Sequence, residues 1–387
     1  MQRKAAGGVG SVETRLHTFA EDEPFRLHNG RTLGPITLAY ETYGQLNDAR
    51  DNAILVFHAL SGSQHAAGHN PTVPGIGGRW TPECQVGWWD MFVGPSKAID
   101  TNQFFVVCAN YLGSCYGSTG PASENPATGK PYGSSFPHIT IADVVDTQMQ
   151  LLDFLGIDKL HAAIGASLGG MMCLSLAVRY PARVGIVVPI AASVAVSPLQ
   201  RILNFEQICA IEQDPNFNGG DYYDAAPPAR GLALARMISH KTYVSLRTME
   251  DRARKEVAHT DDQFSWYPLS NSLESYMLHQ GRKFVERFDA NSFMRIADFW
   301  LRFDLLSEAG ATSMDELFTR CRNQQYLIFS IDSDVCFYPE DQEEMARILK
   351  GAGVSSTRIT VHSEKGHDSF LLEPELFTPH LAYILGP

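Results

Sequence analysis

Continuous runs of apolar residues that alternate with helical segments constrain the fold of this chain more than any other feature. A strand that is apolar along its whole length is expected where helices cover both faces of a sheet. Such runs lie at residues 53–57, 103–108, 160–164, 184–191 and 325–331, followed by a shorter one at 358–361. Helices are predicted between and after them at residues 140–155, 168–179 and 341–350, and beyond Glu373. The alternation indicates an α/β domain with a mainly parallel sheet.

The alternation stops between residues 195 and 319, where charged amphipathic segments replace the strand pattern. We therefore predict that residues 16–194 and 320–387 form one α/β core, and that residues 195–319 are a helical cap inserted into it. The glycine-containing residues 1–15 are predicted to be a disordered tail. A hairpin over residues 24–44, with its turn at Asn29-Gly30, is expected to open the core.

Composition and charge exclude several classes of protein. The 387 residues, 44% hydrophobic and 19% charged, are typical of a folded globular protein, and a formal net charge of −12 gives no overall attraction to nucleic acid or an anionic membrane. No apolar stretch reaches the roughly 18 residues that cross a bilayer, and the start lacks the apolar middle of a signal peptide. We expect a soluble, cytoplasmic protein. Seven cysteines without a C-x-x-C pair argue against a disulfide framework and a structural zinc site.

A candidate nucleophile stands between a predicted strand and a predicted helix. Residues 165–169, GASLG, fit the pattern G-x-S-x-G, in which small neighbours allow a strained serine to expose its hydroxyl. Because the strand 160–164 precedes this turn and a helix follows at once, Ser167 is predicted to be a nucleophile. The alternative is an ordinary glycine-rich turn between a strand and a helix.

A serine nucleophile needs a base and a carboxylate that orients the base. On a sheet of this kind the acid follows a strand and the histidine lies in a late loop. Asp334 and His367 fit these places. Asp332 is the competing acid, and His362 and His58 are the competing bases among 13 histidines: His362 lies in the strand before His367, and His58 ends an early strand.

An acyl-enzyme mechanism also needs two N–H groups for the developing oxyanion. Leu168, directly after the serine, and Leu60, in the loop after the strand 53–57, are the predicted donors. The alternative is that residues 58–68 are only a glycine-bearing turn. His65 and His69 in this loop lack a third ligand at a recognisable spacing, so no metal site is predicted.

The chain resembles the homoserine O-acetyltransferases of methionine biosynthesis, which have the α/β-hydrolase fold. The resemblance runs from about Phe25 to the C-terminus. It is carried by HALSG at residues 58–62, GWWD at 87–90, GP at 94–95 with IDT at 99–101, NYLGSCYGSTGP at 110–121, NPATG at 125–129, SLGGM at 167–171, LARMI at 234–238, RFDAN at 287–291 and GHD at 366–368.

The resemblance implies roles for further residues. Ser167, Asp334 and His367 would be the catalytic triad, Arg236 would bind the homoserine carboxylate, and Asp368 its ammonium group. Tyr243 would be a further substrate contact. A zwitterionic amino acid taken out of water needs a fixed partner of each sign, and a guanidinium can bind a carboxylate at two points.

The function implied is a ping-pong transfer of an acetyl group from acetyl-CoA to the hydroxyl of L-homoserine, with no bound cofactor or metal. Family members are commonly homodimers joined through the cap helices, so a homodimer is expected. Homoserine O-succinyltransferase, serine O-acyltransferase, a serine hydrolase and a non-catalytic scaffold protein are the alternatives. Relatives that use succinyl-CoA tend to place an arginine two residues after the catalytic acid, whereas this chain has Cys336 there, so acetyl is favoured.

Overall fold

The computed structural model describes residues 7–255 and 266–386. Its centre is an eight-stranded sheet in the order β1-β4-β8-β5-β11-β12-β13-β14. The pairs β1–β4 and β4–β8 are antiparallel, and all later pairs are parallel. The strands are β1 (Arg15–Phe19), β4 (Ile36–Tyr43), β5 (Ala53–Phe57), β8 (Phe105–Ala109), β11 (Leu160–Ala166), β12 (Val184–Ile190), β13 (Gln325–Ile331) and β14 (Ser355–Val361). The predicted mainly parallel α/β-hydrolase sheet is confirmed.

Helices cover both faces of this sheet, which explains why its central strands are apolar throughout. In β5, Leu55 and Phe57 face one hydrophobic core, whereas Ile54 and Val56 face the other. The first core includes residues of α1 (Ile141–Phe154), α2 (Leu168–Arg179) and α10 (Pro339–Gly351). The second includes residues of α11 (Ser369–Leu372) and α12 (Thr378–Leu385). Both cores therefore fix the strands on which the site is built.

Short elements connect the main ones. Three small strand pairs are β2 (Phe25–Arg26) with β3 (Thr32–Leu33), β6 (Val93–Gly94) with β7 (Ile99–Asp100), and β9 (Glu124–Asn125) with β10 (Lys130–Pro131). The 3-10 helices are Gly77–Arg79, Pro82–Gln85, Gly133–Ser135, Pro181–Arg183, Asn218–Gly220 and Pro374–Leu376. The predicted hairpin turn at Asn29-Gly30 joins only β2 and β3, because β4 pairs instead with β1 in the main sheet.

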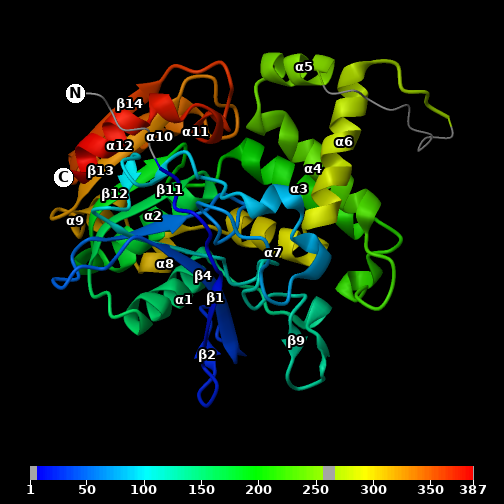
Figure 1. The fold of residues 1–387 in the computed structure, drawn as a ribbon, viewed down its shortest axis with the longest axis horizontal. Coiled ribbons are helices and arrows are strands. Elements are labelled where there is room, and N and C mark those ends of the chain that lie inside the picture. Colours follow the sequence, from blue (N-terminus) through cyan, green and yellow to red (C-terminus); the bar gives the residue numbers. More distant parts are fainter. Residues whose placement is uncertain (1–6, 256–265, 387) are drawn as a thin grey trace.

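A helical segment between β12 and β13 forms the cap (Figure 1). Its helices are α3 (Pro198–Glu212), α4 (Ala229–Tyr243), α5 (Leu246–Lys255), α6 (Ser272–Arg287), α7 (Ala290–Leu301), α8 (Leu305–Ala309) and α9 (Met314–Thr319). Helix α4 packs between α3 and α6, but α8 and α9 pack on α2 and α10 of the core. The predicted cap boundary at residue 319 is therefore too late, and residues 256–265 of the predicted cap lie outside the described residues.

The start of the chain differs from the predicted disordered tail. The Val12 N–H donates to the His69 carbonyl at 3.0 Å, and the Thr14 hydroxyl donates to the Glu41 carboxylate at 2.7 Å. Strand β1 then begins at Arg15. The prediction is wrong for this ordered part because hydrogen bonds to distant residues, which no local pattern reveals, hold it. Residues 1–6 lie outside the described part.

Two further expectations concern the chain as a whole. All seven cysteines fall in the described ranges and carry free thiols. Among the helices of residues 7–255 and 266–386, none is long and apolar enough to span a bilayer.

Candidate active site

Ser167 occupies the sharp turn between β11 and α2. Its backbone has φ 58° and ψ −126°, a left-handed conformation that costs a non-glycine residue energy. The turn is possible because its neighbours are glycines: a Cβ on Gly165 would lie 2.2 Å from the Gly169 carbonyl oxygen, and one on Gly169 would lie 2.4 Å from the Phe57 carbonyl oxygen. The motif thus brings the serine to the carboxyl end of the central strand.

His367 and Asp334 form a buried pair after the ends of β14 and β13. The Nδ1–H of His367 donates to Asp334 Oδ2 at 2.6 Å, while Asp334 Oδ1 accepts the N–H groups of Cys336 and Phe337 at 2.7 and 2.9 Å. Burial alone would lower the pKa of His367, but the charge and hydrogen bond of Asp334 outweigh burial and raise this pKa. Since a carboxylate only accepts, the bond leaves Nε2 as the basic nitrogen.

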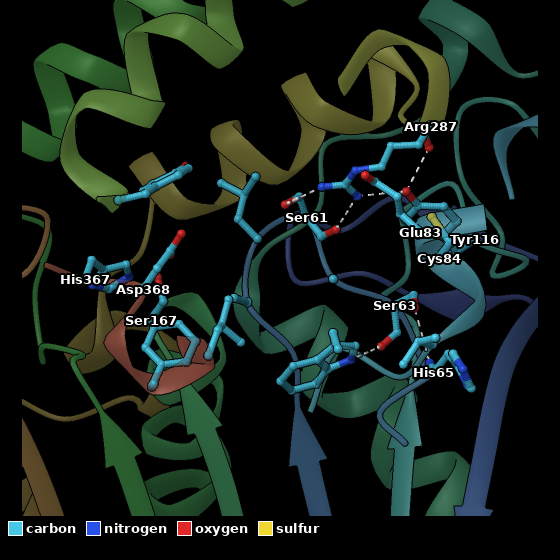
Figure 2. A pocket seen from close by; sticks show the side chains of 18 of the residues that line it. Ser61, Ser63, His65, Glu83, Cys84, Tyr116, Ser167, Arg287, His367 and Asp368 are labelled. Atoms are coloured by element: carbon cyan, nitrogen blue, oxygen red, sulfur yellow. Dashed lines mark hydrogen bonds between the residues drawn. The ribbon is translucent and has the colours of Figure 1, made fainter. Parts of the chain in front are cut away.

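Ser167 and His367 line one cavity of about 290 Å³ (Figure 2). His367 Nε2 is buried and has no hydrogen-bond partner within the described part of the chain. Ser167 is only 5% exposed, so the cavity that it lines is where a substrate can meet it. The three residues predicted as a triad therefore follow the carboxyl ends of β11, β13 and β14, which lie at the same edge of the parallel sheet.

The competing acid and bases are placed elsewhere. Asp332 accepts from His362 Nδ1 at 2.9 Å in a solvent-exposed pair. The competing acid and one of the competing bases are thus bound to each other. His58 is buried and stacks on Tyr111 with ring centroids 3.7 Å apart, and burial lowers its pKa to about 4. None of these side chains is among those that line the described cavity.

The two predicted oxyanion donors also lie at strand ends. Leu60, after β5, lines the cavity, and Leu168 is the first residue of α2. Within residues 7–255 and 266–386, neither N–H donates to a backbone or side-chain acceptor. A helix N-terminus carries a partial positive charge, so the start of α2 favours negative charge beside Ser167.

Arg236, Tyr243 and Asp368 line the same cavity. Arg236 reaches it from α4, with its guanidinium carbon 5.2 Å from the Tyr243 ring centre and 5.1 Å from that of Phe284. Burial lowers the pKa of Arg236, raises that of Asp368, and raises that of Tyr243 to about 12. Arg236 and Asp368 are not within 4.0 Å of each other as an ion pair among the described residues. The cavity thus holds a cation and an anion that are separate.

Sequence reasoning missed Arg287 as a site residue. It lines the cavity from the end of α6, together with Ser61 and Tyr116. The sequence marked Arg287 only as part of the segment 287–291 that carries the family resemblance, because a single charge at a helix end forms no motif.

Cys336, by contrast, is 3% exposed and does not line the described cavity. Its backbone carbonyl instead accepts from Gln200 Nε2 at 2.7 Å.

Over the two described ranges, no group of three or more His, Cys, Asp or Glu side chains is arranged to hold a metal ion. His65 Nδ1 lies 2.7 Å from a carboxylate oxygen of Glu41, and its Nε2 lies 3.0 Å from the Gln85 carbonyl oxygen, so both ring nitrogens have protein partners.

Comparison with known proteins agrees with this geometry. Residues 52–374 match the α/β-hydrolase fold family. The chain is 43% identical over 366 residues to a homoserine O-acetyltransferase of Solidesulfovibrio magneticus, covering 94% of this chain and 90% of that protein. Among solved structures, it is similar to homoserine O-acetyltransferase from Bacillus anthracis (TM-score 0.85, 28% identity, 97% and 98% of the two chains). It is also similar to esterase E22 (TM-score 0.84, 26% identity, 97% and 100%). The chain therefore belongs to the homoserine O-acetyltransferase family, within the α/β-hydrolase fold.

Proposed function

We propose that this protein transfers an acetyl group from acetyl-CoA to the hydroxyl of L-homoserine through an acyl-enzyme on Ser167. The observation that carries the proposal is the separate cation and anion, Arg236 and Asp368, in the cavity that also contains Ser167 and His367. Each charge acts on the pKa of the other, but among the described residues the two form no direct ion pair, and buried charges without such a pair are costly unless a ligand neutralises them. A zwitterionic amino acid with a hydroxyl fits both charges and the nucleophile.

The first half-reaction forms the acyl-enzyme. Ser167 Oγ attacks the thioester carbonyl while its proton passes to His367 Nε2, which Asp334 keeps in the required tautomer. The Leu60 and Leu168 N–H groups stabilise the oxyanion. The C–S bond then breaks, the thiolate of CoA takes the proton from His367, and the acetyl group remains on the serine.

The second half-reaction uses the same groups with homoserine as acceptor. Arg236 binds the substrate carboxylate and Asp368 its ammonium group, which brings the hydroxyl to the acetylated serine. His367 takes the hydroxyl proton as the oxygen attacks the ester. Breaking the bond to Ser167 releases O-acetylhomoserine, and His367 returns the proton to the serine.

Acetyl is proposed as the acyl group because the relatives of this chain are named for it. The cavity also contains Arg287, a cation from the cap that a succinyl carboxylate could meet. However, Arg287 donates to the Ser61 carbonyl and the Tyr116 hydroxyl, both at 3.0 Å. These bonds reduce the capacity of Arg287 to bind a succinyl carboxylate. Cys336 does not line the described cavity, so its lack of charge does not determine which acyl group binds there.

An esterase is the second candidate, because esterase E22 has nearly the same fold over the whole chain. A hydrolase would use the same triad with water as acceptor, so the fold cannot separate the two activities. The presence of both Arg236 and Asp368 in the cavity favours the transferase, since water as acceptor needs neither charge.

A homodimer joined through the cap is also proposed. Large apolar side chains stand exposed on its helices: Ile202 (56%) and Phe205 (63%) on α3, Leu234 (47%) on α4 and Leu273 (38%) on α6. Exposed apolar groups of this kind favour protein contacts. Light scattering on the protein and on Phe205→Glu tests this, with a monomeric variant expected. A cytoplasmic location, the absence of a bound cofactor and the absence of nucleic-acid binding remain predictions.

Mass spectrometry of the protein and of its proteolytic peptides tests the mechanism and the acyl donor together. The protein is incubated with acetyl-CoA alone, with succinyl-CoA alone, and with each plus homoserine. We expect the mass of one acetyl group on the peptide containing Ser167 with acetyl-CoA, and its loss when homoserine is added. Loss at the same rate in buffer without homoserine would support the esterase, and stable labelling only by succinyl-CoA would overturn the acetyl assignment.

A further inference from the structure

The loop that carries Leu60 is a tight turn. The Gly62 N–H donates to the Ala59 carbonyl at 2.9 Å, so residues 59–62 close a four-residue turn with Leu60 and Ser61 at its centre. A Cβ on Gly62 would lie 2.8 Å from His58 Cβ, which explains the glycine. Because the turn is closed, whatever holds the Ser61 peptide also orients the Leu60 N–H.

Arg287 of the cap holds that peptide (Figure 2). Its Nη1 donates to the Ser61 carbonyl and to the Tyr116 hydroxyl, both at 3.0 Å, and its Nη2 lies 3.4 Å from Ser61 Oγ. The Tyr116 hydroxyl in turn donates to the Arg287 carbonyl at 2.8 Å. The guanidinium of Arg287 therefore donates to neutral oxygens of the core. These hydrogen bonds join the end of α6 to the turn 59–62.

The guanidinium itself has little freedom. Its carbon lies 5.1 Å from the Phe284 ring centre, on the same aromatic ring that Arg236 contacts at 5.1 Å. Burial alone would lower the pKa of Arg287, but its interactions with Tyr116, among them the hydrogen bond, outweigh burial and raise this pKa. Two arginines thus share one ring but have different partners: Arg287 contacts the turn, whereas Arg236 faces the open cavity.

We propose that Arg287 is a positioning residue that holds the turn 59–62 and thereby aims the Leu60 N–H at the oxyanion. The proposal rests on the proposed function, because it needs an oxyanion on the Ser167 ester. Both half-reactions pass through such an oxyanion. Loss of Arg287 should therefore slow acylation and transfer by the same factor, whereas a residue that only binds the acceptor would affect transfer alone.

The test compares Arg287→Gln and Arg287→Lys with Arg247→Gln. Arg247 is an exposed arginine of α5 whose partner is Glu364, which makes it a matched control for the loss of a cap cation. The rates of acylation by acetyl-CoA, of transfer to homoserine, and of Ser167 labelling by a fluorophosphonate are measured together with the melting temperature.

We expect Arg287→Gln to lower all three rates by a similar factor, about 10- to 100-fold, because misplacing one oxyanion donor costs less than removing it. The KM for homoserine should stay near the wild-type value. Arg287→Lys should recover part of the rate, since an ammonium group can reach one oxygen but lacks the fork. Arg247→Gln should change none of these rates.

Tyr116→Phe keeps the test valid if Arg287→Gln does not fold. It removes one partner of Arg287 and should lower the three rates equally but less. Unchanged labelling in the folded variants, or a change confined to the KM for homoserine, would overturn the inference alone. Failure of the wild-type protein to be labelled at Ser167 would overturn the proposed mechanism as well.

Discussion

The two ends of the cavity are built in different ways. At the core end, backbone geometry places the groups: the turn at Ser167 is set by close glycine contacts, and Asp334 is held by two backbone N–H groups. At the cap end, side-chain packing places them, since Arg236 and Arg287 both lie against the Phe284 ring. The core end contains the reacting groups, whereas at the cap end Arg236 is placed for recognition and Arg287 binds the core turn instead.

This difference separates chemistry from substrate choice. The strand ends cannot move without disturbing a sheet whose central residues are fully buried. An inserted helical segment can change its exposed side chains with less effect on the sheet, because its described residues contribute no strand to that sheet. The same fold in esterase E22 is consistent with such a division. The predictions that follow test whether the two ends can be damaged independently.

Ser167→Ala should have the largest effect. Removing the nucleophile of a triad typically costs a factor of about 10⁶ in rate, so transfer should be abolished. The melting temperature should hardly change, since alanine at this position keeps the same backbone strain and the change removes a single oxygen atom. Steady-state assays and thermal unfolding are the measurements. A variant that retains more than a few per cent of the activity would rule out the covalent route.

Asp334→Asn should come next and should again affect only the core end. An asparagine can hold His367 in the wrong tautomer, and such a change lowers the rate by about 10⁴-fold in a comparable triad. Asp332→Asn is the matched control, because Asp332 binds the exposed His362 and should leave the activity near normal. Rates of acylation decide the matter. Equal losses in the two variants would contradict the assignment of the acid.

Arg236→Lys should damage the cap end alone. Lysine can make only one of the two contacts that a guanidinium makes with a carboxylate. The lost hydrogen bond to a charged group is worth about 1.5–3 kcal/mol, so the KM for homoserine should rise roughly 10- to 100-fold. Formation of the acyl-enzyme should remain near normal. Single-turnover measurements of the two half-reactions distinguish these effects, with Arg247→Lys as the exposed control. Equal damage to both half-reactions would mean that Arg236 supports the fold or the CoA site.

The smallest effect is expected in the pH dependence. His367 acts as a base only when neutral, and its pKa is raised above 6.5. The acylation rate should therefore increase with pH, and the midpoint of this increase should lie above pH 6.5. Asp368 binds an ammonium group only when ionised, and burial raises its pKa above 3.8, so the KM for homoserine should fall as pH rises through that higher value.

Asp368→Asn separates these two profiles. The KM for homoserine should become high and lose its acidic dependence on pH. The acylation midpoint should fall slightly, because the charge of Asp368 contributes to the raised pKa of His367. An unchanged KM profile in this variant would argue against Asp368 as the partner of the ammonium group.

Much of the core could be predicted from the sequence because its elements have strong local patterns. The strand Ala53–Phe57, the helix Leu168–Arg179 and the strand Gln325–Ile331 have the predicted bounds. Strand β1 was missed because it is a partly exposed edge strand, without a continuous apolar run. Helices α8 and α9 were assigned to the cap because no local pattern distinguishes a helix that packs on the core from one that packs on the cap.

Sequence reasoning identified some residues of the site better than others. The places of Ser167, Asp334 and His367 follow from chain order on a parallel sheet, which sequence reasoning could use. Arg236 and Asp368 were suggested only by a family resemblance, since lone charges on helices have no pattern of their own. Arg287 was missed because its role depends on Ser61 and Tyr116, which lie far from it in the chain.

The left-handed backbone of Ser167 also has a consequence for how natural selection acts on this chain. A non-glycine residue in such a conformation costs about 1–3 kcal/mol of folding stability, and glycine would adopt it without that cost. Ser167→Gly should therefore raise the melting temperature while removing the nucleophile. At this one position, selection for heat resistance and selection for activity favour different residues, and a copy of the chain freed from its catalytic duty would gain stability by losing the serine.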